Sequence, residues 1–163
     1  MESHFILMDA AHIKRIVQRM AIQVLEQIDD GEIPILIGLN ERGKAMAIQL
    51  KEAIEKEGEA EIEFYSFSVS DAANATLPDC NDRFVLLIDD VIFSGKTMFK
   101  ALSLITQRFE VARIMVATLV DRGHRRYPIL SNFKGMYAPT KLKEHVEVLV
   151  KHGALDQVIL FKN

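Results

Sequence analysis

The stretch that decides the expected fold of this chain is VLLIDDVIFSGKT, residues 85–97. Its first part is an apolar, partly β-branched run, which predicts a buried strand ending in Asp89 and Asp90. Apolar residues then recur at helical spacing from Lys96, so a helix is expected over about residues 95–108. Backbone N–H groups at such a turn can hold a phosphate, and carboxylates can accept hydrogen bonds from hydroxyls. The pattern therefore indicates a site for a phosphorylated sugar.

The bulk composition is that of a globular protein. A length of 163 residues suggests one domain, residues 1–163, with enough chain to bury a core. No apolar run approaches the length of a membrane span, and the first residues lack the layout of a signal peptide. We therefore expect a cytoplasmic protein without a membrane partner. The single cysteine, Cys80, excludes an internal disulfide and a cysteine-rich metal site.

The net charge of −3 conceals an asymmetry between the two halves of the chain. Residues 1–82 carry 7 Lys and Arg against 16 Asp and Glu, whereas residues 83–163 carry 13 against 7. The balance is therefore −9 in the first half and +6 in the second. A basic half is suited to a phosphorylated ligand or to nucleic acid, although surface cations that are merely solvated give the same count.

The order of the remaining patterns predicts the fold class. The segments are a helix capped by Asp9 and ended at 29–31, a strand at 34–39, a helix at 44–56, a strand around Ile62 and Phe64, a mobile loop at 66–82, a strand at 113–120, and β-rich runs at 145–150 and 157–161. This order predicts an α/β fold, a mostly parallel twisted sheet flanked by helices, with a small C-terminal β-rich extension. Ligands bind such sheets beyond the carboxyl ends of the strands, where the segments 39–43, 89–97 and 121–126 fall.

Two of these segments allow more than one interpretation. The segment 38–43 can present successive N–H groups to an anion, with Arg42 as a charged fork, or can be a plain connection from strand to helix. Gly95, Lys96 and Thr97 also suggest a nucleotide triphosphatase. A P-loop, however, needs a glycine five positions before its Gly-Lys pair, and that position holds Asp90. A Rossmann glycine fingerprint is absent from the sequence as well.

Residues 85–97 resemble the signature of the type I phosphoribosyltransferases. That signature has several apolar residues, two acids, two apolar residues, two mostly small residues, Gly, any residue and Thr; Phe93 is bulkier than most at its position. The runs LVDRGHRRYPI (119–129) and NFKGMYAPT (132–140) resemble one subgroup, the bifunctional pyrimidine operon attenuator/uracil phosphoribosyltransferases. The segment 38–43 is similar to the family's pyrophosphate loop. The resemblance spans nearly the whole chain.

The resemblance implies transfer of the 5-phosphoribosyl group from 5-phosphoribosyl diphosphate to a nucleobase, with uracil as the leading base. It implies Mg²⁺ as cofactor, held mainly by the substrate near Asp89 and Asp90, and a homo-oligomer such as a dimer. The implied roles are Asp89 and Asp90 for catalysis; Val91, Ile92, Phe93, Ser94, Gly95, Lys96 and Thr97 for the 5-phosphate; Asn40, Glu41, Arg42 and Gly43 for pyrophosphate; and Phe133 and Lys134 for the base.

Two alternatives to an enzyme remain open. One is a catalytically weak, nucleotide-sensing regulator of pyrimidine genes that binds RNA, and the other is an interaction protein that kept the fold and lost the ligand. The segment 66–82 is shorter than in the subgroup, with no Lys or Arg between residues 64 and 82. Glu41 and Lys134 also differ from the subgroup's usual residues. These departures are the reason to keep the alternatives.

Overall fold

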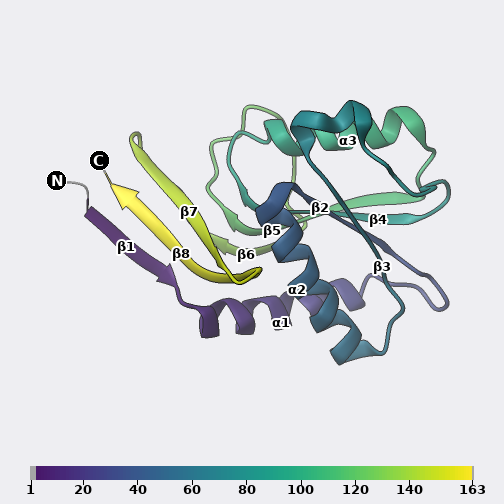
Figure 1. The fold of residues 1–163 in the computed structure, drawn as a ribbon, viewed down its shortest axis with the longest axis horizontal. Helices are drawn as coiled ribbons and strands as arrows, with labels where there is room; N and C mark the ends of the chain where they lie inside the picture. Colours follow the sequence, from purple (N-terminus) through teal and green to yellow (C-terminus); the bar gives the residue numbers. More distant parts are fainter. Residues whose placement is uncertain (1–2, 163) are drawn as a thin grey trace.

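The computed structural model describes residues 3–162 and contains two sheets (Figure 1). The larger sheet is parallel throughout and has the strand order β3-β2-β4-β5-β6. Its strands are β2 (Ile35–Leu39), β3 (Glu63–Phe67), β4 (Phe84–Ile92), β5 (Arg113–Asp121) and β6 (Phe133–Tyr137). The α/β class and the parallel sheet flanked by helices that the sequence predicts are therefore confirmed.

The central strands are apolar because both faces of the sheet are covered. Alternate residues of β2 and β4 enter different cores, with Leu36 and Leu86 in the larger core and Ile37 and Leu87 in the smaller. Helices α1 (Ala10–Leu25) and α2 (Asn40–Gly58) supply the larger core, and α3 (Lys96–Arg108) supplies the smaller. The sheet is thus a middle layer whose faces are closed, and only its strand ends are left for a site.

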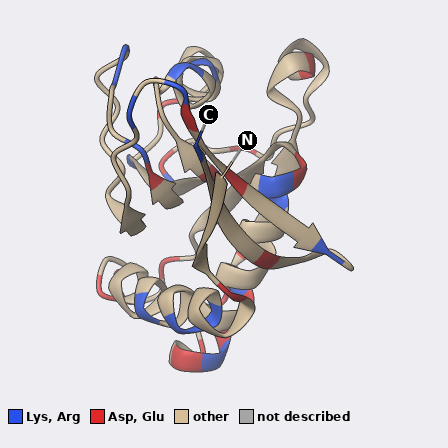
Figure 2. Ribbon diagram, turned by 90° about the vertical axis from the view of Figure 1, so that its left-hand side faces the viewer, with Lys and Arg blue, Asp and Glu red and all other residues tan. Residues whose placement is uncertain are grey.

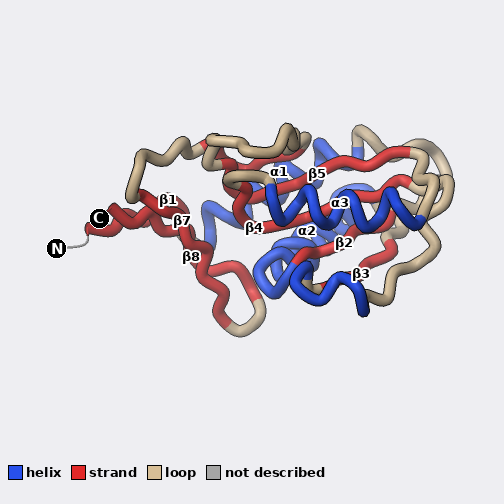
Figure 3. The backbone as a smooth tube through the Cα atoms, turned by 90° about the horizontal axis from the view of Figure 1, so that it is seen from above, coloured by secondary structure: helices blue, strands red, loops and turns tan. Residues whose placement is uncertain are grey.

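The smaller sheet is antiparallel, with the order β1-β8-β7, and lies at one end of the molecule (Figures 1 and 3). It consists of β1 (Ser3–Met8), β7 (Glu144–Lys151) and β8 (Ala154–Lys162). The predicted C-terminal β-rich extension is the hairpin of β7 and β8. The N-terminal strand β1 was not predicted, and it forms because Ser3 to Ile6 pair with Ile159 to Lys162 at the other end of the chain.

Several element boundaries differ from those that the sequence predicts. Helix α1 begins after the predicted cap, Asp9, whose carboxylate accepts the His12 N–H at 2.8 Å, but it ends at Leu25 instead of 29–31. Helix α2 begins at Asn40 instead of 44, directly after β2. Strand β4 continues through both acids to Ile92 because Val91 and Ile92 still pair with β5. The expected loop at 66–82 contains the end of β3 and a 3-10 helix, Val69–Asn74.

Cys80 is fully buried in the smaller core, and burial raises the pKa of its thiol. No helix within residues 3–162 is long and apolar enough to cross a membrane.

Strand β6 forms the edge of the larger sheet and is held in place by α1. Arg19 donates hydrogen bonds from Nη2 to the carbonyls of Gly135 at 2.8 Å and Lys134 at 3.2 Å, so the open edge of β6 is partly satisfied. A Cβ at Gly135 would lie 2.5 Å from the Leu119 carbonyl oxygen and 2.8 Å from Ile16 Cγ2. Close approach of α1 to the sheet therefore requires a residue without a side chain at this position.

Gly135→Ala tests this close approach. We expect the added methyl group to push α1 from the sheet and to destabilise the protein by about 1–3 kcal/mol, the usual range for overpacking. In a domain of this size each kcal/mol corresponds to about 2–4 °C in Tm, measured by calorimetry. Lys134→Ala, at an exposed neighbouring position, is the control and should leave Tm nearly unchanged. Equal Tm values for Gly135→Ala and the wild type would contradict the packing argument.

Candidate functional site

The candidate site lies where β2, β4 and β5 end and α2 and α3 begin. Gly38 is in register with Ile88, Asp89 with Thr118, and Ile92 with Asp121, so the carboxyl ends of the three strands are adjacent. A Cβ at Gly43 would lie 2.8 Å from the Ile88 carbonyl oxygen and 3.1 Å from Asp89 Oδ1. The predicted pyrophosphate segment and the predicted acid pair are therefore in contact.

The two acids differ in their environments. Asp89 is 8% exposed and accepts a hydrogen bond from the Asp90 N–H at 2.9 Å, whereas Asp90 is only partly buried. Burial raises the pKa of Asp89 well above the usual carboxyl range, and the neighbouring charge of Asp90 raises it further. A cation close to Asp89 would favour its ionised form. The pair therefore combines a carboxylate suited to a cationic partner with one that is open to solvent.

The turn between β4 and α3 lines a small cavity that is open to solvent on one side. Residues 93–95 form the turn, Gly95 has φ of +83°, and α3 begins at Lys96 as the sequence predicts. The cavity has a volume of about 130 Å³ and is lined by Asp89 and residues 91–98, which include all seven predicted 5-phosphate residues. This volume is that of about four water molecules in the liquid. The geometry suits one small anion at the N-terminus of α3.

The loop after β5 holds this turn in place. The Ser94 carbonyl accepts N–H groups of Arg126 and Tyr127, both at 2.9 Å, and Arg125 Nη1 donates to the Phe93 carbonyl at 3.0 Å. Arg125 is itself fixed by an ion pair with Asp121 at 2.8 Å. Burial alone would raise the pKa of Asp121, but hydrogen bonds from Arg125 and from the Gly123 N–H lower it below its usual value. The polar residues after β5 thus support the turn.

Phe93 is held from two sides by residues that sequence reasoning did not assign to the site. The Arg122 guanidinium lies 4.1 Å from the centroid of the Phe93 ring, and the His124 ring meets it edge-on at 5.9 Å. Arg122 also donates from Nε to Thr140 Oγ1 at 3.1 Å and from Nη2 to the Glu144 carbonyl at 2.8 Å. Burial lowers the pKa of Arg122. Its signals in the sequence were its place just beyond the carboxyl end of a strand and within the run 119–129 that resembles the subgroup.

The predicted pyrophosphate residues lie on the first turn of α2. Asn40 has φ of +59°, and its Oδ1 accepts the Val69 N–H at 2.9 Å, which ties the 3-10 helix to α2. Glu41 is exposed, whereas Gly43 is buried. Arg42 forms an ion pair with Glu147 of β7, with Nη2 3.3 Å from Oε1. The segment is therefore the start of a helix and contacts both the 3-10 helix and the smaller sheet.

The predicted base-binding residues lie on β6, two strands from the acid pair. Lys134 pairs with Thr118, which pairs with Asp89, and its side chain is exposed. Phe133 is 6% exposed and packs in the larger core on the α1 side of the sheet. The structure thus brings the acids, the 5-phosphate turn and the start of α2 together, and it leaves the Phe133 ring inside the core.

Two carboxylates do not make a complete metal cage. No group of three or more His, Cys, Asp or Glu side chains within the described residues could hold a metal ion. Asp89 and Asp90 fit a Mg²⁺ ion that takes most of its ligands from water and from substrate oxygens, since this ion usually retains several waters.

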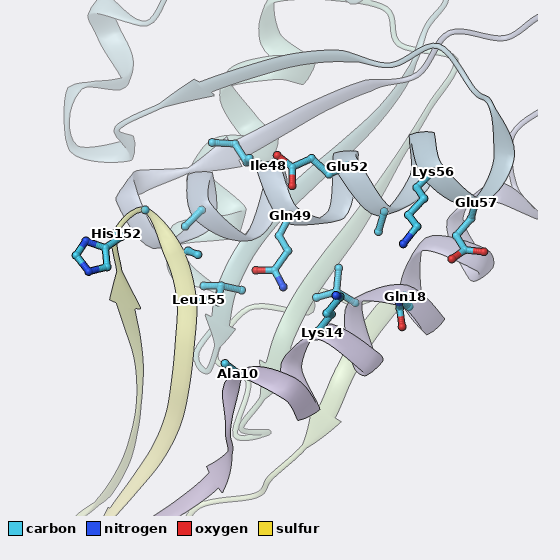
Figure 4. Close-up of a pocket in the computed structure, with 15 residues that line it drawn as sticks. Ala10, Lys14, Gln18, Ile48, Gln49, Glu52, Lys56, Glu57, His152 and Leu155 are labelled. Carbon is cyan, nitrogen blue, oxygen red and sulfur yellow. The ribbon is translucent and has the colours of Figure 1, made fainter.

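A separate groove of about 520 Å³ lies between α1 and α2 (Figure 4). Lys14 and Gln18 line it from α1, and Gln49 and Glu52 from α2, while the turn around His152 closes one end. None of the predicted site residues lines this groove. Figure 2 shows both charge signs along α2, whereas the charged residues of α1 and α3 are all Lys or Arg.

Comparisons with known proteins agree with this geometry. The family model described as "Phosphoribosyl transferase domain" matches residues 6–152. The "Bifunctional protein PyrR" of Pediococcus pentosaceus is 34% identical over 173 residues, covering 96% of this chain and 98% of that protein. The protein of the same name from Staphylococcus haemolyticus is 34% identical over 174 residues and covers 98% and 99%.

Solved structures share the fold at lower identity. A hypoxanthine-guanine-xanthine phosphoribosyltransferase has a TM-score of 0.75 at 17% identity and covers 94% of this chain and 92% of its own. The hypoxanthine phosphoribosyltransferase of Trypanosoma cruzi, solved with IMP, has a TM-score of 0.74 at 16% identity and covers 83% and 76%. The acid pair, the turn after it and the matched span of residues 6–152 agree: the chain belongs to the phosphoribosyltransferase domain family.

Proposed function

We propose that the chain transfers the 5-phosphoribosyl group from 5-phosphoribosyl diphosphate to a nitrogen base in the cytoplasm, with uracil as the leading base. The ring nitrogen forms a bond to carbon 1 of the ribose and gives up its proton, while the bond from carbon 1 to the pyrophosphate oxygen breaks. The products are a nucleoside monophosphate and pyrophosphate. The observation that carries the proposal is the anion-sized cavity at the turn, with the buried carboxyl of Asp89 in its wall.

Different groups of residues would bind different parts of the substrate. The turn at 93–97 would bind the 5-phosphate through backbone N–H groups at the start of α3. Asp89 and Asp90 would accept hydrogen bonds from the ribose hydroxyls, and their charge would stabilise the cationic character that develops on the sugar. Asp89 and Asp90 would help to hold Mg²⁺, whose positive charge would offset the charge of the leaving group.

The pyrophosphate and the base would occupy opposite sides of the ribose. Arg42 and the Gly43 N–H at the start of α2 would bind pyrophosphate, with Asn40 and Glu41 beside them. On the other side, backbone groups of β6 near Lys134 would hydrogen-bond the edge of the base. Phe133, which the resemblance assigns to the base, would have to turn out of the core to present a ring face to it.

Asp90→Asn tests the catalytic role of the acid pair. Removing one charge that stabilises the developing sugar cation should lower kcat/KM by about 10²-fold, the low end for loss of one electrostatic stabiliser. The assay is release of pyrophosphate from 5-phosphoribosyl diphosphate with uracil and Mg²⁺, repeated with other nucleobases. Asp30→Asn removes a charge in the turn before β2, at the opposite end of that strand from the site, and should retain wild-type activity. If no base supports turnover by the wild type, the proposed activity is wrong.

Asp89→Asn tests whether the buried acid stabilises the transition state at the expense of the fold. The folded-state pKa of Asp89 is raised above its unfolded value, so the free energy of unfolding falls as pH rises from near 3.8 through the folded-state pKa. Asparagine stays neutral, so the variant should have a higher Tm than the wild type at pH 7 and lose activity. The Tm difference should shrink toward pH 4. A Tm difference between Asp89→Asn and the wild type that does not depend on pH would contradict the idea that the buried charge of Asp89 lowers stability.

A second candidate function, regulation of pyrimidine genes through RNA, is favoured by the word "bifunctional" in the names of the relatives and by the +6 balance of residues 83–163. We expect the chain to bind pyrimidine leader RNA in a gel shift at low salt. Three phosphate contacts would weaken binding about 20-fold between 50 and 200 mM salt. Absence of binding at the lower salt concentration would exclude this function.

A further inference from the structure

The ion pair between Arg42 and Glu147 joins two parts of the molecule that are distant in sequence. Arg42 lies on the first turn of α2, and Glu147 lies in the middle of β7, which is an edge strand of the smaller sheet. Arg42 Nη2 lies 3.3 Å from Glu147 Oε1, and the two side chains are 52% and 37% exposed, respectively. Among the described residues, this is the one ion pair between α2 and the smaller sheet.

The position of Arg42 gives this contact a consequence for the site. The next residue, Gly43, packs against Asp89. Arg42 is therefore attached to the backbone one residue before the point where α2 meets the acid pair. A guanidinium presents a fork of N–H donors that suits a carboxylate or a phosphate group. Here the carboxylate of Glu147 uses one end of that fork. An incoming pyrophosphate that binds both ends of the fork would need the Nη2 donor that Glu147 occupies.

We propose that Glu147 is an internal competitor for pyrophosphate: it holds Arg42 against β7 in the free protein and thereby weakens binding of pyrophosphate groups. The proposal rests on the proposed function and assigns Glu147 as a positioning residue that acts through Arg42. Binding of the ligand exchanges one carboxylate partner of Arg42 for a more highly charged phosphate partner. Glu147 then stands free beside the pyrophosphate position.

The size of the effect follows from the exposure of the pair. Both side chains are in contact with solvent, and ion pairs of this kind change equilibria by about two- to fivefold. Because exposed charges are screened, the effect should diminish as ionic strength rises. The competition concerns binding and does not touch carbon 1 of the ribose, so it should alter KM for 5-phosphoribosyl diphosphate more than kcat.

Glu147→Gln in the full chain tests the proposal, since glutamine keeps the shape and removes the charge. The Kd of pyrophosphate, measured by calorimetry with Mg²⁺, should fall about two- to fivefold, KM should fall with it, and the gain should disappear at high salt. Asp156→Asn, on β8 of the same sheet, removes the same charge without a contact to Arg42 and should not show this gain. In a double-mutant cycle, Glu147→Gln should give no gain when Arg42→Gln is already present.

The outcomes separate this proposal from the proposed function. If the wild type turns over substrate and Glu147→Gln leaves the Kd of pyrophosphate and KM unchanged, the proposed competition by Glu147 is wrong. The proposed enzymatic function would still stand. An equal gain in the Arg42→Gln background or with Asp156→Asn would also overturn it, because the effect would then be one of general charge. If neither the wild type nor Glu147→Gln binds pyrophosphate or turns over substrate, both proposals fail.

Discussion

The site depends on the close approach of α2 to the end of β4. A side chain at Gly43 would overlap the Ile88 carbonyl oxygen, so the helix can sit against the strand only because this residue has none. The contact brings the N–H groups of the first turn of α2 to the acid pair, where the positive end of the helix favours negative charge. Burial nevertheless outweighs this effect at Asp89, whose pKa is raised. The same contact thus brings the parts of the site together and helps to bury Asp89, so that ionisation of this carboxyl is unfavourable.

The layered fold explains why the chemistry gathers at this edge. The residues of β2 are buried on both faces, and those of β4 are buried as far as Asp89, so polar groups have room only where these strands end. Within the described residues, Asp89, Thr118 and Asp121 are buried polar groups of β4 and β5. Thr118 is satisfied by Ser131 at 2.7 Å and Asp121 by Arg125, whereas Asp89 accepts the Asp90 N–H and takes part in no ion pair among the described residues. A buried acid left in this condition is typical of a functional group.

Local patterns were enough to predict the elements whose cause is local. The apolar run before Asp89, the helix from Lys96 and the hairpin of β7 and β8 follow from periodicity and turn residues, and the structure confirms them. Strands β1 and β6 were not predicted, because β1 depends on pairing with β8 and β6 on pairing with β5 and on Arg19. The start of α2 at Asn40 depends on a left-handed backbone conformation that a non-glycine residue rarely adopts.

The site shows the same division between local and distant causes. Its acids and its turn were found from one contiguous motif. The contact of the Arg122 guanidinium with the Phe93 ring and the ion pair of Arg42 with Glu147, however, join residues that are far apart in the chain. Both arginines reach β7: Arg122 binds the Glu144 carbonyl, and Arg42 binds the Glu147 side chain three residues later. One arginine contacts Phe93 in the turn after β4, and the other belongs to the start of α2. The smaller sheet supplies none of the predicted catalytic residues, yet β7 holds one arginine from the loop after β5 and one from the start of α2, the two segments that lie next to the β4 end.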